Sequence, residues 1–193
     1  MEPKISAILI AAGCSRRMGD EDKLLLPYRG ETLLQHAVNL LLALPVYERI
    51  LVTKEALLPG LALPPGIKTI GNLYPEEGQS ESMKLGVLAA MGDWYFFMAA
   101  DQPKLTTRDL MPLLACAKDA KSIIYPEVNQ KPCTPVLFSA SFRDELLAVH
   151  GDRGGRAVRA AHPEACLPVR MDNPGHFIDI DDEDDYQALL SLE

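Results

Sequence analysis

The sequence predicts a single three-layer α/β domain built around a mostly parallel, twisted sheet. Apolar runs of strand length alternate with amphipathic segments of helix length, which is typical of βαβ units. The run at residues 94–100 contains no charged residue, as expected for a strand buried on both faces. No internal repeat, low-complexity tract or clear interdomain linker interrupts the chain, so residues 1–193 are interpreted as one domain.

The first half of the chain is expected to supply three strands and two helices. Thr32 has the side chain of an N-cap, and the apolar residues after it recur at helical spacing. Residues 57–66 are rich in Leu, Pro and Gly, which favours a loop or irregular turn. The expected elements are strands at 5–10, 49–53 and 67–70 and helices at about 32–43 and 80–91.

The second half continues the alternation after the strand at residues 94–100. A helix capped by Thr106 or Thr107 is expected to run to about residue 119. A glycine-rich turn at residues 151–155 precedes a short helix. The remaining expected elements are strands at 122–125, 135–138 and 167–171 and helices at 141–149, 156–161 and 182–192.

Composition excludes several classes of protein. The net charge of −8 disfavours general nucleic-acid binding, which needs a basic face. No apolar stretch approaches about 18 residues without a charge or breaker, so no membrane span is expected. The first residues lack a secretory pattern, so a cytoplasmic location is expected. The four cysteines include no C-x-x-C pair, which disfavours a zinc site or a disulfide framework.

Small residues and cations follow the first strand directly. Residues 11–13 read Ala-Ala-Gly and would let a backbone approach a ligand closely, while Arg16 and Lys23 can hold a triphosphate. The turn matches neither the Walker A nor the G-x-G-x-x-G pattern. The alternative is an ordinary polar loop with scattered charges. The pattern favours a phosphate-binding turn.

Asp101 is the candidate metal ligand. It follows the buried run at 94–100 and lies at the expected carboxyl end of the sheet, where ligands bind in open α/β folds. A carboxylate there can hold Mg²⁺ while phosphate oxygens complete the coordination. A simple turn or capping role is the alternative.

Five motifs in order resemble one known family. The pattern A-A-G-x-S-x-R-M-G-x(3)-K at residues 11–23 is similar to the signature of the MobA-like nucleotidyltransferases, specifically the molybdenum cofactor cytidylyltransferase branch. The resemblance continues through the segments 78–86, 101–103, 151–156 and 179–184. It implies a Rossmann-like nucleotidyltransferase domain.

The resemblance also implies roles for particular residues. A loop under the base and ribose would include Gly78, Gln79 and Ser80; an acceptor side would include Asp152, Arg153 and Arg156. Asp179 would be the second metal ligand beside Asp101, with Asp181 as a substitute. The implied nucleotide-binding residues are Ala11, Ala12, Gly13, Ser15, Arg16, Lys23, Gly78, Gln79 and Ser80, with Lys23, Arg16 and Asp101 catalytic.

The chain departs from the family pattern at two places. Residues 133–135 read Cys-Thr-Pro where the family has G-H-P, in the part used around the acceptor. The second departure is at residues 182–183, where Asp-Glu replaces Thr-Pro. The first departure bears on the identity of the acceptor, and the second on a helix cap.

The implied activity is Mg²⁺-dependent transfer of CMP from CTP to the phosphate of molybdopterin, with release of pyrophosphate. A molybdoenzyme or its chaperone would be the protein partner, with no nucleic-acid or membrane partner. One alternative keeps the chemistry and changes the nucleotide or acceptor: guanylyl transfer to the cofactor, or transfer to a sugar or methylerythritol phosphate. Another is a nucleotide- or cofactor-binding module without turnover.

Overall fold

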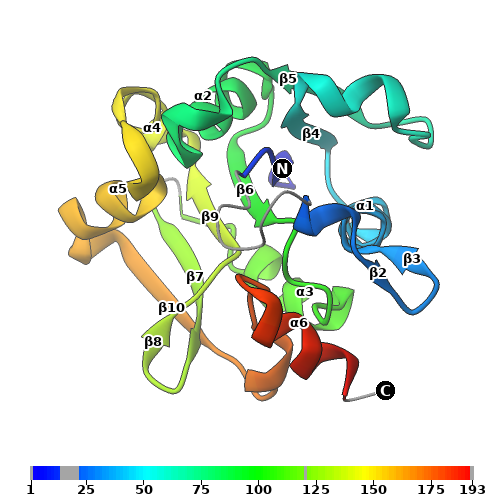
Figure 1. Cartoon of the computed structure of the whole chain (residues 1–193). Helices are drawn as coiled ribbons and strands as arrows, with labels where there is room; N and C mark the ends of the chain where they lie inside the picture. The colour runs from blue at the N-terminus through cyan, green and yellow to red at the C-terminus, as the bar shows by residue number, and fades with distance from the viewer. Residues whose placement is uncertain (1, 14–21, 120, 192–193) are drawn as a thin grey trace.

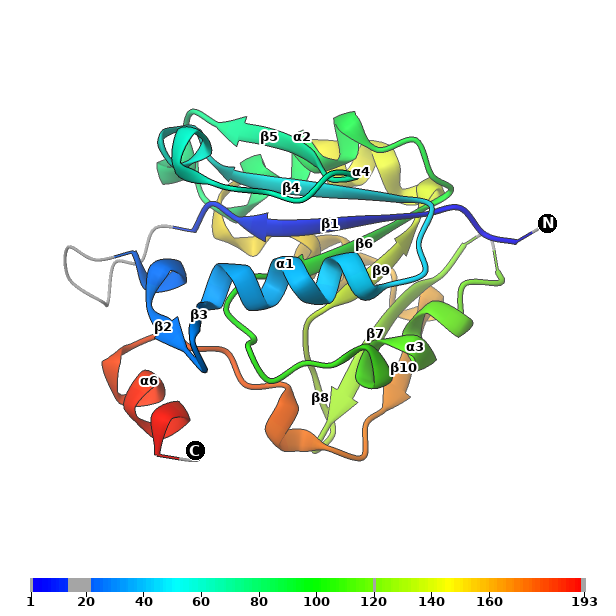
Figure 2. The ribbon, with the colours of Figure 1, turned by 90° about the vertical axis from the view of Figure 1, so that its right-hand side faces the viewer.

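One twisted sheet runs through the middle of the molecule, with helices packed on both of its faces (Figures 1 and 2). The computed structural model describes residues 2–13, 22–119 and 121–191. Within them the sheet has eight strands, in the order β10-β7-β9-β6-β1-β4-β5, and β8 pairs with β7. The strands are β1 (Ile5–Ala11), β4 (Glu48–Lys54), β5 (Lys68–Asn72), β6 (Trp94–Ala99), β7 (Ile123–Val128), β8 (Lys131–Pro132), β9 (Val136–Ser139) and β10 (Cys166–Arg170).

The central strands are parallel, and β9 is antiparallel to both of its neighbours. β1 lies between β4 and β6, with Ile8 paired to Ile50 on one side and to Phe97 on the other. A separate two-stranded hairpin joins β2 (Pro27–Tyr28) and β3 (Glu31–Thr32). The sheet is therefore mostly parallel, as the alternating apolar and amphipathic segments predict.

The helices cover the sheet in two layers (Figure 2). On one face α1 and α3 pack over residues such as Leu9 and Phe96, and on the other α2, α4 and α5 pack over residues such as Ile8 and Phe97. The helices are α1 (Leu33–Ala43), α2 (Gln79–Ala89), α3 (Thr107–Ala115), α4 (Arg143–Ala148), α5 (Gly155–Ala161) and α6 (Glu183–Leu190). Alternate residues of the central strands thus face opposite cores, which is why the middle of each of these strands is apolar on both faces.

The closing helix α6 packs beside the β2–β3 hairpin. Tyr28, Leu33, Ile180, Tyr186 and Leu189 form a third apolar cluster there. The Tyr186 hydroxyl donates a hydrogen bond to the Pro27 carbonyl at 2.6 Å. This contact joins two segments from opposite ends of the chain near the end of β1, and residues 180–182 lie between α6 and that edge of the sheet (Figure 1).

The predicted helix caps are confirmed in detail. The Thr32 side chain accepts a hydrogen bond from the Gln35 backbone N–H at 3.1 Å, and Thr106 caps α3 in a capping box with Asp109. α3 ends at Ala115, earlier than expected, and β7 extends to Val128. Among the residues described, no helix combines the length and the apolar character that a bilayer crossing requires.

Candidate active site

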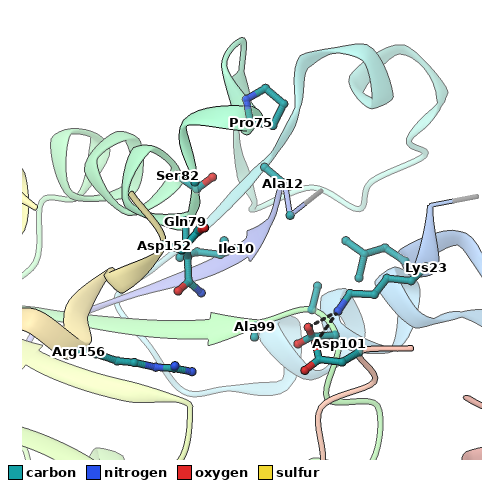
Figure 3. A pocket seen from close by; sticks show the side chains of 15 residues that line it. Ile10, Ala12, Lys23, Pro75, Gln79, Ser82, Ala99, Asp101, Asp152 and Arg156 are labelled. Carbon is teal, nitrogen blue, oxygen red and sulfur yellow. Dashed lines mark hydrogen bonds and ion pairs between the residues drawn. The ribbon is translucent and has the colours of Figure 1, made fainter. Parts of the chain in front are cut away.

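A cavity of about 510 Å³ opens at the carboxyl ends of β1 and β6 (Figure 3). These strands are parallel neighbours, so their following residues meet at one edge of the sheet. Ala12 and Gly13 come from the end of β1, and Asp101 comes from the turn after β6. Ala12, Gly13 and Lys23, from the two described ends of the turn that is expected to bind phosphate, therefore share one pocket with Asp101.

Lys23 lies at the carboxyl edge of the sheet in a 3₁₀ turn, Lys23–Leu25, after the first strand. Its Nζ donates to Asp101 Oδ2 at 2.7 Å and to the Ile180 carbonyl at 2.7 Å, and approaches Asp181 Oδ1 at 3.4 Å. Burial acts to lower the pKa of Lys23, but the charges of Asp101 and Asp181 outweigh it and leave that pKa above its usual value. Lys23 is a fixed cation in the pocket.

The second oxygen of Asp101 is buried without a hydrogen-bond partner in the described part of the chain. The backbone around it is fixed, because the Asp101 carbonyl accepts from the Ile180 N–H at 2.9 Å and the Ala100 N–H donates to the Ile10 carbonyl at 3.2 Å. A buried carboxylate oxygen that lacks a donor is costly unless a ligand or cation satisfies it. Asp101 is thus prepared for a further positive partner.

Asp179 is a solvent-exposed carboxylate that lines the second cavity close to other negative charges. Partial desolvation by the surrounding protein, together with the charges of Asp101 and Asp181, raises the pKa of Asp179 to about 6. A hydrogen bond from Gln102 and the charge of Lys23 act in the opposite direction. Carboxylates gathered in this way favour a bound cation, which would offset their mutual repulsion.

The opposite wall of the pocket comes from α2, α5 and the 3₁₀ turn Gly151–Arg153 (Figure 3). Gly78 has a φ of +95°, and a Cβ there would lie 2.5 Å from Asp152 Oδ1 and 2.7 Å from the Gly151 carbonyl carbon. Glycine therefore lets the loop before α2 lie directly against the turn at Gly151. Gln79 and Arg156 complete this wall.

A second cavity of about 460 Å³ adjoins the first. Both are lined by Ile10, Gln79, Ala99 and Arg156. The second cavity continues toward the β7–β8 hairpin and contains Asp179. Two spaces that share side-chain walls beside Asp101 and Asp179 can hold two substrates next to each other.

The structure brings most of the expected residues together. Ala12, Gly13, Lys23, Gly78, Gln79, Asp101, Asp152 and Arg156 line the first cavity, and Gln79, Arg156 and Asp179 line the second. Ala11, Ser80 and Arg153 line neither cavity, and Ser80 is buried. Ser15 and Arg16 lie outside the described residues.

The resemblance implies that Asp152, Arg153 and Arg156 lie on the acceptor side. Asp152 lines the first cavity, while Arg156 lies between the two.

Sequence reasoning missed three contributors to the site. The Ile180 carbonyl accepts a hydrogen bond from Lys23. Ser82 lines the first cavity, and its hydroxyl oxygen accepts a hydrogen bond from the Asn72 amide at 3.0 Å. Gln102 lines the second cavity. Gln102 and Ser82 lie inside the motif segments, but the sequence alone does not indicate a role for either. A backbone carbonyl such as that of Ile180 leaves no signal in the sequence.

Comparison with known proteins places this geometry in a family. The model of the MobA-like NTP transferase domain matches residues 7–166. A molybdenum cofactor guanylyltransferase of Shewanella baltica is 26% identical over 198 residues, which cover 98% of this chain and 97% of the relative. A nicotine blue oxidoreductase of Paenarthrobacter nicotinovorans is 28% identical over 173 residues, covering 83% of this chain and 84% of the relative.

Solved structures share the fold. The Rv0371c protein of Mycobacterium tuberculosis H37Rv has a TM-score of 0.80 at 24% identity, covering 97% of this chain and 98% of that one. A nucleotidyl transferase from Methanothermobacter has a TM-score of 0.80 at 23% identity, covering 98% of this chain and 99% of that one. Because the family model spans most of the chain, this nucleotidyltransferase-fold protein belongs to the MobA-like NTP transferase domain family.

Proposed function

We propose that the protein transfers a cytidylyl group from CTP to the terminal phosphate of a molybdopterin-type acceptor and releases pyrophosphate. The observation that supports this most directly is the pair of adjoining cavities, which share Gln79 and Arg156 and meet beside Asp101 and Asp179. The first cavity would hold the nucleotide and the second the acceptor. The name of the Shewanella baltica relative supports a molybdenum cofactor as acceptor.

The reaction depends on positioning two anionic substrates and neutralising their charge more than on proton transfer. A phosphate acceptor is already an anion at neutral pH, so it can attack the α-phosphate without a general base. The enzyme must hold two anions in line, and fixed cations in a partly buried site lower the cost of bringing them together. Lys23 would contact the triphosphate, and Arg156, between the cavities, would contact the transferred or the accepting phosphate.

The residues of the site fit Mg²⁺. Asp101 has a buried oxygen without a donor in the described chain, and Asp179 has a pKa raised to about 6 by partial desolvation and by neighbouring carboxylates. Both supply the hard oxygen ligands that Mg²⁺ prefers. Asp101 and Asp179 would hold the ion, which when bound would supply positive charge that reduces the repulsion between substrate and carboxylates. A solved structure of the Rv0371c protein is described as a complex with manganese.

Two observations favour different bases. The Ala11-Ala12-Gly13 sequence resembles the cytidylyltransferase branch and supports CTP. The guanylyltransferase relatives support GTP as the second candidate. The acceptor and the chemistry are the same in both cases, so one assay can distinguish them.

Pyrophosphate release with Mg²⁺ tests the proposal. CTP, GTP, UTP and ATP are supplied in turn, each with and without molybdenum cofactor, to the wild-type protein and to Asp101→Asn. Release that needs both CTP and the cofactor, and that is lost in Asp101→Asn, would support the proposal. Release with GTP instead would support the second candidate. Folded wild-type protein that releases no pyrophosphate with any nucleotide and this cofactor would contradict both.

A further inference from the structure

Three cations line the second cavity without an anionic partner. They are Arg156, Arg159 and Lys131. None of them forms an ion pair with a carboxylate within residues 2–13, 22–119 and 121–191. In the same ranges, Asp179 is the one carboxylate residue of the cavity wall. Because the whole chain has a net charge of −8, a cavity with an excess of positive charge indicates an anionic ligand.

Two of these cations lie about one helical turn apart on α5. Residues three positions apart on a helix share a face, so Arg156 and Arg159 project from the same side of α5. Arg156 lines both cavities and extends toward the side of the pocket where Asp101 lies (Figure 3). Arg159 lines only the second cavity. The two side chains are therefore suited to two different parts of one ligand.

The guanidinium group of Arg159 is held over the ring of Tyr125. Its Cζ lies 4.9 Å from the ring centroid, within the range of a cation–π interaction. The charge of Arg159 also acts on the cavity wall at Cys133. Burial and the charge of Asp179 raise the pKa of the Cys133 thiol, and the charge of Arg159 opposes that rise. Tyr125, on β7, thus holds a cation in place beside the second cavity.

The remaining wall adds a further cation and several apolar side chains. Lys131 is exposed and comes from β8. Met83, Met98 and Phe177 also line the cavity. A wall of this kind suits an apolar or ring-shaped scaffold that carries separate anionic groups. An acceptor whose phosphate was its only anionic group would leave Arg159 and Lys131 without a partner.

We propose that Arg159 determines acceptor specificity by binding a second oxyanion, which the acceptor carries apart from the phosphate that reacts. This rests on the proposed function, in that the second cavity is taken as the acceptor site and Arg156 as a phosphate contact. The planar guanidinium group matches an oxyanion in two hydrogen bonds, and Tyr125 is its positioning residue. Acceptors of this class are anionic at both ends, unlike a simple sugar phosphate.

Binding of two small aryl phosphates tests the inference without turnover. Phenyl phosphate carries one anionic group, and 4-carboxyphenyl phosphate carries a second at the far end of the ring. Each is titrated by calorimetry into wild-type protein, Arg159→Met and Arg156→Met. Methionine keeps much of the apolar stem of arginine and removes the charge. Arg108→Met is the control, because Arg108 is exposed on α3 and lines neither cavity.

Wild-type protein and Arg108→Met should bind 4-carboxyphenyl phosphate about tenfold or more tightly than phenyl phosphate, since one charge-assisted contact is worth about that factor. The preference should fall below about twofold in Arg159→Met, with the affinity for phenyl phosphate nearly unchanged. Arg156→Met should weaken both probes to a similar degree. An unchanged preference in Arg159→Met, an equal loss of both probes there, or no saturable binding of 4-carboxyphenyl phosphate by wild-type protein would overturn the inference.

Two variants of Tyr125 test its positioning role. Tyr125→Phe keeps the ring under the guanidinium group and should keep the preference for 4-carboxyphenyl phosphate, whereas Tyr125→Leu should reduce it severalfold. Equal preferences in these two variants would show that the ring does not position Arg159. Failure of the proposed function has a different signature, namely wild-type protein that still prefers 4-carboxyphenyl phosphate but releases no pyrophosphate with any nucleotide and molybdenum cofactor.

Discussion

Lys23 Nζ and Asp101 Oδ2 lie 2.7 Å apart, joining the turn after β1 to the end of β6. One residue is the proposed cation for the triphosphate and the other the proposed metal ligand. Each stabilises the charge of the other, so neither is an isolated charge in a partly buried site. Substrate binding would replace this contact with phosphate and metal contacts, and both partners can therefore be tested by substitution.

Lys23→Ala is expected to lower turnover by about 10²–10³-fold, because it removes the fixed charge that we propose contacts the triphosphate. Steady-state pyrophosphate release measures the effect. Lys68→Ala is the matched control, since Lys68 is an exposed lysine on β5 that lines neither cavity. A loss smaller than about threefold in Lys23→Ala would remove Lys23 from the mechanism.

Asp101→Asn is expected to abolish pyrophosphate release while leaving nucleotide binding nearly intact. The amide keeps the shape of the side chain but loses the negative charge that a cation would need. Nucleotide affinity is measured by calorimetry, with Asp93→Asn as the control because Asp93 is exposed and lines neither cavity. Equal activity in the two variants would show that Asp101 is not a metal ligand.

The raised pKa of Asp179 makes stability depend on pH. Its pKa is about 6 in the folded protein against 3.8 ordinarily, so the folded state binds this proton more tightly. Its contribution to stability is complete below about pH 3.8 and is lost as the pH rises through about 6. In EDTA, Asp179→Asn should therefore be more stable than wild type at pH 7.5, and this difference should be smaller at pH 4.5; solvent screening at the exposed side chain keeps the difference small.

Urea denaturation at the two pH values measures this difference. Asp172→Asn, at an exposed aspartate, should show no such trend. Added Mg²⁺ should stabilise wild-type protein more at pH 7.5 than at pH 4.5, because cation binding favours the ionised carboxyl group. A gap between wild type and Asp179→Asn that widens toward low pH would contradict the assignment.

Gly78→Ala is expected to raise the KM for the nucleotide more than tenfold and to destabilise the fold by about 1–3 kcal/mol. The new Cβ would meet the Asp152 side chain and the Gly151 backbone, in addition to the strain of a positive φ. Gly66→Ala isolates the strain, since Gly66 has a φ of +93° and its Cβ would meet nothing within 4 Å. Similar thermal shifts and nucleotide KM values in the two variants would show that the contact with the Gly151 turn is unimportant.

The order of helices and strands could be predicted because it depends on local patterns. Thr32 and Thr106 cap the expected helices, and the apolar run before Asp101 forms β6. The antiparallel direction of β9 depends on tertiary pairing with β6 and β7, which no local pattern reports. The β2–β3 hairpin escaped prediction because each of its strands has two residues.

The parts of the candidate site that directly follow neighbouring strands could be predicted from the sequence. The contacts between segments that are distant in the sequence could not. Asp101 and Gly13 share a cavity because parallel strands end at one edge. The bond from Lys23 to the Ile180 carbonyl joins segments 157 positions apart, and a backbone acceptor has no residue-type signature. The contact between Asp152 and Gly78 also joins residues that are far apart in the sequence, so it is seen only in the folded chain.

Gln79 and Arg156 line both cavities, and this shared wall affects how the product is released. Under the proposed function the product is one molecule whose two halves remain in the two cavities. Each half is tethered to the other at high effective concentration, so the whole leaves only when both sets of contacts open together. Slow departure of this kind would shelter the product until a receiving protein takes it.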